Sequence, residues 1–310
     1  ESRILAEDAR EAQKKLAAFA QEKLDEIVER MAEEISKHAC ELAKMSSEET
    51  DYGVWQDKYI KNRFACEYLL NGLKGMRCVG VIKEDPENKT MDVGVPMGVI
   101  VALCPATSPV STSIYKALIA VKSGNAMIFS PHPRARETMG KALDILIQTA
   151  EENGLPEGAL AYLHTVTQSG TVELMNHPAT SLIMNTGVPG MLKSAYRSGK
   201  PVIYGGAGNG PAFIERTADI RQAVKDIIAS KTFDNGIVSA AEQSIVVDGC
   251  IADEVKRELQ NSGAYFMTEE ESRKLGSLLF LPDGSLDSEL VGKSAQELAK
   301  RAGFCVSSSV

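Results

Sequence analysis

The stretch from Gly98 to Pro109, GVIVALCPATSP, decides the fold class of this chain. It opens with a continuous apolar run, which is typical of a strand that is buried on both faces of a parallel sheet. A turn rich in Pro and Thr follows, and a helical pattern then runs from about Ser111 to Lys122. A buried strand, a turn and a helix form one unit of a parallel α/β sheet, in which ligands bind at the carboxyl ends of the strands.

The same unit recurs further along the chain. Residues 126–130 (AMIFS) predict a second buried strand, and the segment PHPRAR then opens a helix that runs to about Asn153. Shorter strands are predicted at residues 161–165 and 182–185, with a helix at residues 171–175 between them. Strand and helix alternate with a period near 30 residues, which predicts an α/β, doubly wound fold.

The N-terminal part of the chain is predicted to be helical. Apolar residues recur at steps of three and four in residues 5–44, which indicates one or two amphipathic helices. A second helical pattern covers residues 50–73 and ends at glycines. Residues 76–95 then predict two strands around the polar turn EDPENK.

The composition is that of a globular protein. The 310 residues are enough for two ordinary domains, and they are 44% hydrophobic and 25% charged. The formal net charge of -8 argues against a nucleic-acid partner, because such a partner needs a basic face. No apolar run reaches the roughly 18 residues of a membrane span, so no membrane partner is expected.

The cysteines and histidines show no metal-ligand spacing. Six scattered cysteines without a C-x-x-C pair indicate a reducing compartment rather than a disulfide framework. We therefore expect a cytoplasmic protein with no metal site, and a bacterial microcompartment stays open as a location. Cys104 and Cys250 are expected to pack as small hydrophobic residues rather than act as nucleophiles.

The segment from Lys231 to Ser244, KTFDNGIVSAAEQS, presents one hydroxyl group beside a turn. Its Asp-Asn-Gly sequence favours the turn, because Asp and Asn bond their own backbone and Gly accepts a positive φ. Ser239 follows the apolar pair after this turn, and SIVVD at residues 244–248 predicts a buried strand. Such an arrangement holds Ser239 on a rigid edge. Taken alone, the small residues 239–241 favour simple packing over a catalytic role.

In its context, this segment resembles the active-site segment of CoA-acylating aldehyde dehydrogenases. This family is similar to the aldehyde half of bifunctional aldehyde-alcohol dehydrogenases and to CoA-dependent succinate semialdehyde dehydrogenases. The segments TGVPGM (residues 186–191) and SPHPRA (residues 130–135) also carry the resemblance, which covers nearly the whole chain. It implies an aldehyde dehydrogenase-like fold: a Rossmann-type cofactor domain with N-terminal helices at residues 1–226, and part of a catalytic domain at residues 227–310. The family's chain continues past this point, so a truncated sequence is expected.

The resemblance also implies a reaction. The family converts an aldehyde reversibly to an acyl-CoA with NAD or NADP, CoA being the co-substrate, through a thioester on a cysteine. Ser239 stands at the position of that cysteine. A hydroxyl is far harder to ionise than a thiol with a pKa of about 8.5, and the nearby sequence offers no histidine as its base. We therefore expect a chain that binds cofactor but turns over poorly, as an engineered or a natural variant.

Two segments are predicted to contact the cofactor. A glycine turn between a strand and a helix favours anions, and the resemblance implies that Thr186, Gly187 and Val188 lie against the nicotinamide half. Val188 replaces a glycine of the family and should crowd that contact. After the second strand, where nucleotide-binding sheets read the adenosine ribose, the resemblance implies cofactor contacts from Ser130, His132, Pro133 and Arg134. Arg134 and Arg136 suit a 2′-phosphate, or they are surface cations.

Two further segments bear on the chemistry. In the family, an asparagine at the position of Ser108 donates an amide to the oxyanion; Ser108 offers a shorter donor, and such donors contribute ~3 kcal/mol each. The alternative is a Pro-bounded turn. The resemblance implies that Ala106 and Thr107 of the same segment contact the cofactor. It implies the same for Gly205 and Gly206 of YGGAGNGP (residues 204–211). Without the resemblance, that segment is typical of a flexible connector between strands. Gly205 aligns with the glutamate that activates water in hydrolytic relatives.

Two other functions stay open. One is a catalytically silent cofactor-binding or assembly protein on the same fold, and the other is a hydrolytic aldehyde dehydrogenase, which Gly205 disfavours. The expected partners are a small aldehyde, coenzyme A and further copies of the chain in a homo-oligomer. The aldehyde itself is not readable from the sequence, and acetaldehyde, succinate semialdehyde and sulfoacetaldehyde are all candidates.

Overall fold

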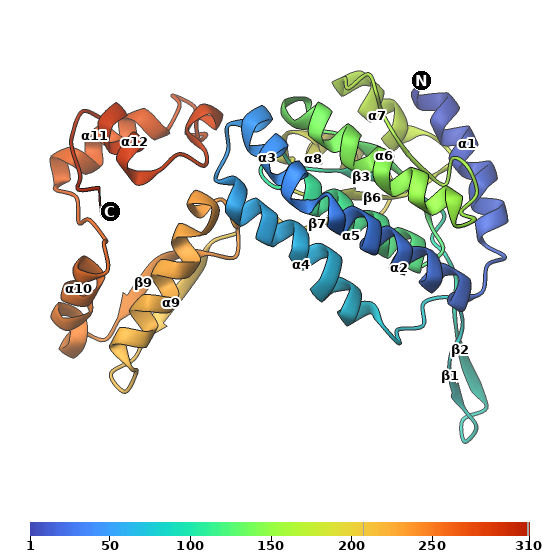
Figure 1. Ribbon diagram of the computed structural model, residues 1–310, viewed down its shortest axis with the longest axis horizontal. Helices are drawn as coiled ribbons and strands as arrows, with labels where there is room; N and C mark the ends of the chain where they lie inside the picture. The colour runs from blue at the N-terminus through green and yellow to red at the C-terminus, as the bar shows by residue number, and fades with distance from the viewer. Residues whose placement is uncertain (207, 309) are drawn as a thin grey trace. The chain divides into compact units, whose positions relative to one another are not determined.

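The structure of the protein is a computed structural model that describes residues 1–206, 208–308 and 310 (Figure 1). It divides into two compact units. The first consists of residues 1–50 and 58–206, and the second of residues 51–57 with the described residues after 206. The roles of a cofactor domain to residue 226 and a partial catalytic domain after it stay predictions.

The first unit is built on a parallel sheet with the strand order β5-β4-β3-β6-β7 in the described residues. The strands are β3 (Val99–Leu103), β4 (Ala126–Ser130), β5 (Leu160–Tyr162), β6 (Thr180–Asn185) and β7 (Val202–Tyr204). All residues of β3 and β4 are buried, as their apolar sequences predict. Leu103 pairs in register with Ser130 on one side and with Asn185 on the other, so three strands end at one level.

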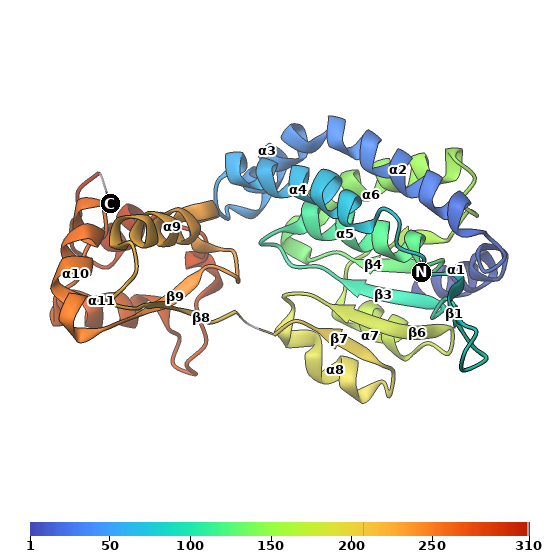
Figure 2. The same cartoon turned by 90° about the horizontal axis from the view of Figure 1, so that it is seen from below.

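Helices cover both faces of this sheet, which confirms the predicted doubly wound α/β fold. The helices that connect the strands are α5 (Pro109–Lys122), α6 (Arg136–Glu152), α7 (Gln168–Asn176) and α8 (Leu192–Arg197). Figure 2 shows α5 and α6 on one side of the sheet and α7 and α8 on the other. The strand order reverses between β3 and β6, the point at which doubly wound sheets bind ligands.

The N-terminal region contains more helices than its periodicity predicts. Residues 2–50 form α1 (Ser2–Leu16), α2 (Gln21–Lys37) and α3 (Ala39–Thr50), and α4 (Trp55–Leu73) follows. The physical reason for the first break is that α1 packs on β4 and α7, whereas α2 packs on α5 and α6. The chain must therefore turn between them. As predicted, an antiparallel hairpin of β1 (Gly80–Asp85) and β2 (Thr90–Gly94) comes next.

The second unit contains the parallel pair β8 (Gly210–Ile214) and β9 (Glu242–Val247). Its described helices are α9 (Ile220–Thr232), α10 (Ala252–Asn261), α11 (Glu269–Leu279) and α12 (Ala295–Arg301). Ile214, Val224 and Val255 form the centre of a small apolar core. The prediction of a buried strand at residues 244–248 is wrong: α9 and α10 pack on one face of β9, and Val246 on the other face is 52% exposed.

The described residues contain neither a candidate membrane-spanning helix nor a candidate cluster of metal ligands. None of the helices there combines the length and the apolar composition that crossing a bilayer requires. In the same residues, no group of three or more His, Cys, Asp and Glu side chains is arranged to hold a metal ion.

Candidate functional site

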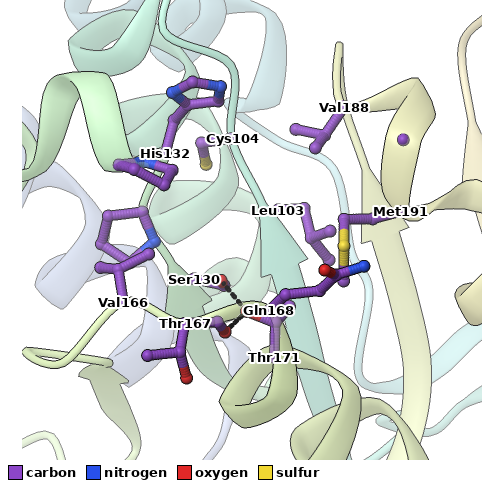
Figure 3. A pocket seen from close by; sticks show the side chains of 13 residues that line it. Leu103, Cys104, Ser130, His132, Val166, Thr167, Gln168, Thr171, Val188 and Met191 are labelled. Carbon is purple, nitrogen blue, oxygen red and sulfur yellow. Dashed lines mark hydrogen bonds between the residues drawn. The ribbon is translucent and has the colours of Figure 1, made fainter.

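A pocket of about 250 Å³ lies at the carboxyl ends of β3 and β4 in the first unit (Figure 3). Four residues of the predicted cofactor set line it: Ser130, His132, Pro133 and Val188. Cys104 lines it as well. The structure therefore brings SPHPRA and TGVPGM, which are more than 50 residues apart in the chain, to one cavity.

Sequence reasoning missed one wall of this pocket. Residues 166–168 and Thr171, at the start of α7, line the cavity together with Met191. The Ser130 and Thr171 hydroxyls are 2.8 Å apart, and the Thr171 hydroxyl also donates to the Thr167 carbonyl at 3.0 Å (Figure 3). The only sequence signal was Thr167 before a helix, which it caps. Apolar walls with a few fixed hydroxyls suit a flat heteroaromatic ring.

His132 shapes the turn after β4. Its Nδ1 accepts a hydrogen bond from the backbone N–H of Arg134 at 3.1 Å. Burial lowers the pKa of His132, and the charge of Arg134 lowers it further. An imidazole that accepts through Nδ1 and resists protonation acts here as a neutral structural group.

An acidic side chain, Glu49, caps the first backbone N–H groups of α6. The carboxylate of Glu49 accepts the backbone N–H groups of Glu137 and Thr138 at 2.9 and 2.8 Å. Arg136 forms an exposed ion pair with the neighbouring Glu137. Arg136 is thus exposed and paired with an acidic side chain, and a contact with a 2′-phosphate stays a prediction.

The turn after β6 is fixed from both sides. The Thr186 N–H donates to the Leu103 carbonyl at 3.1 Å, which ties the turn to the end of β3. Gly187 has φ 65°, and a Cβ there would lie 2.7 Å from the Pro105 Cβ, so the position requires glycine. Asn185 donates to the Val188 carbonyl at 2.9 Å and accepts its N–H at 3.2 Å.

Val188 lies at the pocket wall, as Figure 3 shows. The helix after this turn, α8, has six residues and begins only after a 3-10 turn (Pro189–Met191). The predicted glycine turn between a strand and a helix is thus present, with the α-helix itself starting at Leu192, and the binding of an anion there stays a prediction.

A buried lysine joins the ends of β3 and β6. The Lys116 ammonium donates to the carbonyls of Leu103 at 2.7 Å and of Met184 at 2.9 Å. Its burial lowers the pKa of Lys116, although the neighbouring Cys104 opposes the shift. Cys104 is fully buried, which confirms that it packs as a small side chain, and this burial raises the pKa of its thiol. The same prediction for Cys250 is wrong, because Cys250 is exposed.

Two lysines of α4 hold the loop that contains Ser108. Lys58, which is buried, donates to the Thr107 carbonyl at 2.8 Å, and Lys61 donates to the Ser108 Oγ at 2.8 Å. Since Lys61 donates to this oxygen, the Ser108 O–H proton stays available to another acceptor. In the sequence, the i,i+3 spacing of the two lysines was the only signal of this contact.

Ser239 lies in the second unit and is exposed. It occupies a turn in which the Ala241 N–H donates to the Val238 carbonyl at 3.0 Å. A Cβ on Gly208 would lie 1.7 Å from the Ser239 carbonyl oxygen, so these two backbones are in direct contact. The hydroxyl is therefore held on a fixed turn and is accessible.

Among the predicted glycines, Gly205 and Gly206 are exposed, and a Cβ on either would meet no atom within 4 Å. Ala207, which belongs to the same YGGAGNGP segment, lies outside the described residues. Ala106 is buried and Thr107 is partly buried, but neither is among the residues that line the described pocket. The catalytic and cofactor-binding roles of these residues stay predictions.

Comparisons with known proteins agree with the α/β fold of the chain. The model of the aldehyde dehydrogenase family matches residues 2–275. The bifunctional aldehyde-alcohol dehydrogenase AdhE of Escherichia coli K12 is 41% identical over 306 residues, which cover 99% of this chain and 34% of that protein. The chain thus spans about a third of the length of this relative.

Solved structures give the same result. An acetylating aldehyde dehydrogenase from Geobacillus thermoglucosidasius is 43% identical with a TM-score of 0.96, over 100% of this chain and 68% of that chain. An engineered glycolyl-CoA reductase with bound NADP+ is 29% identical with a TM-score of 0.86, over 100% of this chain and 70% of that one.

Proposed function

The chain belongs to the aldehyde dehydrogenase family, and we propose that it forms the cofactor-binding and nucleophile-bearing part of an enzyme that interconverts an aldehyde and an acyl-CoA. The pocket at the ends of β3 and β4 carries this proposal, because it gathers the SPHPRA and TGVPGM segments at the switch point of a parallel sheet. The similarity of the chain to an acetylating aldehyde dehydrogenase and to a glycolyl-CoA reductase supports the acyl-CoA product.

The pocket fits the adenosine end of NAD or NADP. The apolar side chains Val166, Val188 and Met191 provide the walls for a flat ring, and the Ser130 and Thr171 hydroxyls provide a polar edge. When bound, a nicotinamide dinucleotide supplies hydride transfer. The residues of this chain bind and orient the dinucleotide, and the Thr186 turn stays fixed by its bond to Leu103.

CoA, rather than water, is the proposed acyl acceptor. Gly205 has no side chain that could act as a base for water, and the described surroundings of its Cβ position are open. An acyl group on residue 239 would therefore persist until a thiol attacks it. Coenzyme A and a short aldehyde are the proposed substrates.

Ser239 is proposed to make this chain a poor catalyst. A serine hydroxyl ionises far less readily than a cysteine thiol, and an oxyester transfers its acyl group to a thiol less readily than a thioester does. The exposed position of Ser239 on its turn supports the proposal that residue 239 is the position of the nucleophile. The low reactivity of the Ser239 hydroxyl, rather than its position, is the proposed reason for poor catalysis.

An assay of the chain and of the Ser239→Cys variant tests the proposal. Each protein is incubated with NAD or NADP and a panel of short aldehydes, with and without CoA, and the products are identified. We expect CoA-dependent acyl-CoA formation by the variant and little by the unchanged chain. A free acid formed equally without CoA would instead identify hydrolysis.

A catalytically silent cofactor-binding protein is the second candidate. Three positions depart together from the family pattern: Ser239, Ser108 and Val188. This function predicts that the unchanged chain binds NAD or NADP in calorimetry, and that neither it nor the Ser239→Cys variant turns over any aldehyde.

Self-association is proposed as well. The β1–β2 hairpin exposes several large apolar side chains, which soluble monomers rarely gather in one place. They are Val81, Ile82, Met91 and Val93. Light scattering after size-exclusion chromatography should give a mass of two or more chains, and Val81→Lys with Met91→Lys should lower it.

A further inference from the structure

Residues 51–57, which are the link between α3 and α4 together with the first three residues of α4, pack in the second unit, although α3 and the rest of α4 lie in the first. We call this segment the connector. Several bonds hold it there. The Tyr52 hydroxyl donates to the Ser288 carbonyl at 3.0 Å, and the Gly53 N–H donates to the Gly292 carbonyl at 3.1 Å. Lys293 donates to the carbonyl of Asp51 at 3.2 Å.

Asp234 is the residue of the FDNG turn that holds this connector. Its side chain is fully buried, and its Oδ1 accepts the backbone N–H of Val54 at 2.7 Å. Its own backbone N–H donates to the Asp57 carboxylate at 2.7 Å. The approach is close: a Cβ on Gly53 would lie 1.9 Å from Asp234 Oδ1. The turn and the connector are therefore fitted to each other.

The turn needs such support because of its backbone. Asp234 and Asn235 have φ values of 50° and 52°, in the left-handed region that side chains other than glycine rarely adopt. Two successive residues of this kind persist only where their surroundings fix them. Here the Asn235 amide donates to the Gly292 carbonyl at 2.8 Å, and the Asp234 bonds hold the other residue.

The fixed turn leads directly to residue 239. The Ile237 N–H donates back to the Asp234 carbonyl at 3.3 Å, and the Val238–Ala241 turn that contains Ser239 follows at once. Ile237 also packs into the connector, because Cβ atoms built on Gly53 and Gly292 would lie 3.0 and 2.6 Å from its Cδ1. A change in the Asp234 conformation would therefore redirect the chain at residue 239.

We propose that the connector 51–57 is the positioning element for the segment that bears residue 239, and that Asp234 is the positioning residue. The inference rests on the proposed function, in which residue 239 is the position of the nucleophile. Asp234 acts through the backbone of the turn: its carboxylate receives the connector, and the connector in turn keeps two left-handed residues in place.

Two substitutions of Asp234 test whether it positions the segment that bears residue 239. Asp234→Gly tolerates the positive φ and removes the acceptor, whereas Asp234→Asn keeps an acceptor oxygen and tolerates the left-handed region. Hydrogen exchange followed by mass spectrometry should show the Ile237 and Ala241 amides exchanging about tenfold faster in Asp234→Gly. In Asp234→Asn they should exchange nearly as in the unchanged chain. The β9 amides in both variants are the internal control.

Trp55 provides a second readout, because it is the one tryptophan of the sequence and lies in the connector. Its emission should shift to longer wavelength in Asp234→Gly and return in Asp234→Asn. Unchanged exchange at Ile237 and Ala241 would overturn the inference even if Trp55 shifts, since Asp234 would then hold only the connector. Equally faster exchange throughout β9 would overturn it too, because it would show a general stabilising role.

Kinetic measurements relate the positioning role of Asp234 to the proposed function of residue 239. In the Ser239→Cys background, Asp234→Gly should lower kcat at least fivefold and leave the Kd for NAD unchanged, because the dinucleotide pocket is lined by the other unit. Complete inactivity of the Ser239→Cys chain would contradict the proposed function alone. The exchange and fluorescence measurements need no turnover and would still decide the role of Asp234.

Discussion

The backbone N–H of Val54 and the carboxylate of Asp234, which are 180 residues apart in the chain, form a hydrogen bond of 2.7 Å. This bond brings a seven-residue connector to the turn that precedes Ser239. A helix-to-helix linker in this protein thus serves as a structural part of the candidate nucleophile segment, and its sequence is constrained by a partner in a distant region.

Restoring the oxyanion donor should raise activity beyond that of Ser239→Cys alone. Ser108→Asn in the Ser239→Cys background supplies an amide of longer reach, and one such donor contributes ~3 kcal/mol, or about 100-fold in kcat. Steady-state kinetics with a short aldehyde, CoA and NAD measure the gain. Ser108→Ala is the matched control and should lower kcat; equal rates for the two variants would exclude Ser108 from the reaction.

Lys116→Met should destabilise the first unit by about 2 kcal/mol, because it leaves the Leu103 and Met184 carbonyls without their buried donor. Urea unfolding measures the change. Lys83→Met, on the exposed β1 strand, is the control and should change the free energy of unfolding little.

The same lysine predicts a pH dependence. Burial lowers the pKa of Lys116 in the folded state below the ordinary 10.5, so the unfolded chain binds the proton more tightly. The Lys116 contribution to the free energy of unfolding should therefore rise as pH increases from the lowered pKa toward 10.5. This rise should be missing in Lys116→Met, and an identical pH profile in both proteins would contradict the assignment.

Glu49→Ala should cost about 1 kcal/mol of stability, because it removes the carboxylate that caps the first amides of α6. The adjacent Glu48 is exposed and makes a matched control as Glu48→Ala. Thermal unfolding should show a lower Tm for the first variant only. An equal decrease in both would assign the effect to net charge rather than to the cap.

Gly187→Ala should destabilise the turn after β6 by about 1–3 kcal/mol, since it combines a positive φ with a clash against Pro105. Gly190→Ala, where a Cβ meets no atom within 4 Å, is the steric control. Urea unfolding of both variants gives the comparison, and NAD calorimetry should show weaker binding for Gly187→Ala. Wild-type stability in that variant would show that the turn relaxes freely.

The sequence predicts the sheet well because its strands are buried on both faces. The unbroken apolar run from Val99 to Leu103 has one stable environment, the centre of a parallel sheet, and it lies there. The same logic fails for β9, whose apolar residues resemble a buried strand although the described structure covers only one face. The residue types of a strand show that it can be buried, but they do not show whether other elements cover one face of it or both.

The candidate site was predictable where its residues lie beside strand ends. Ser130, His132 and Val188 follow this rule and line one pocket. Lys58 and Lys61 do not, because the sequence of a helix does not show whether a lysine on it faces solvent or a distant loop. The sequence predicted one or two helices where residues 2–50 form three, since the break between α1 and α2 depends on the elements on which each helix packs.

All residues that line the pocket at the ends of β3 and β4 come from the first unit, whereas residue 239 belongs to the second. The proposed function therefore assigns nucleotide binding and turnover to separate stretches of the chain. It implies that an exchange at position 239 alters the chemistry and leaves the lining of the pocket unchanged, so that one codon separates a dehydrogenase from a protein that only binds the nucleotide.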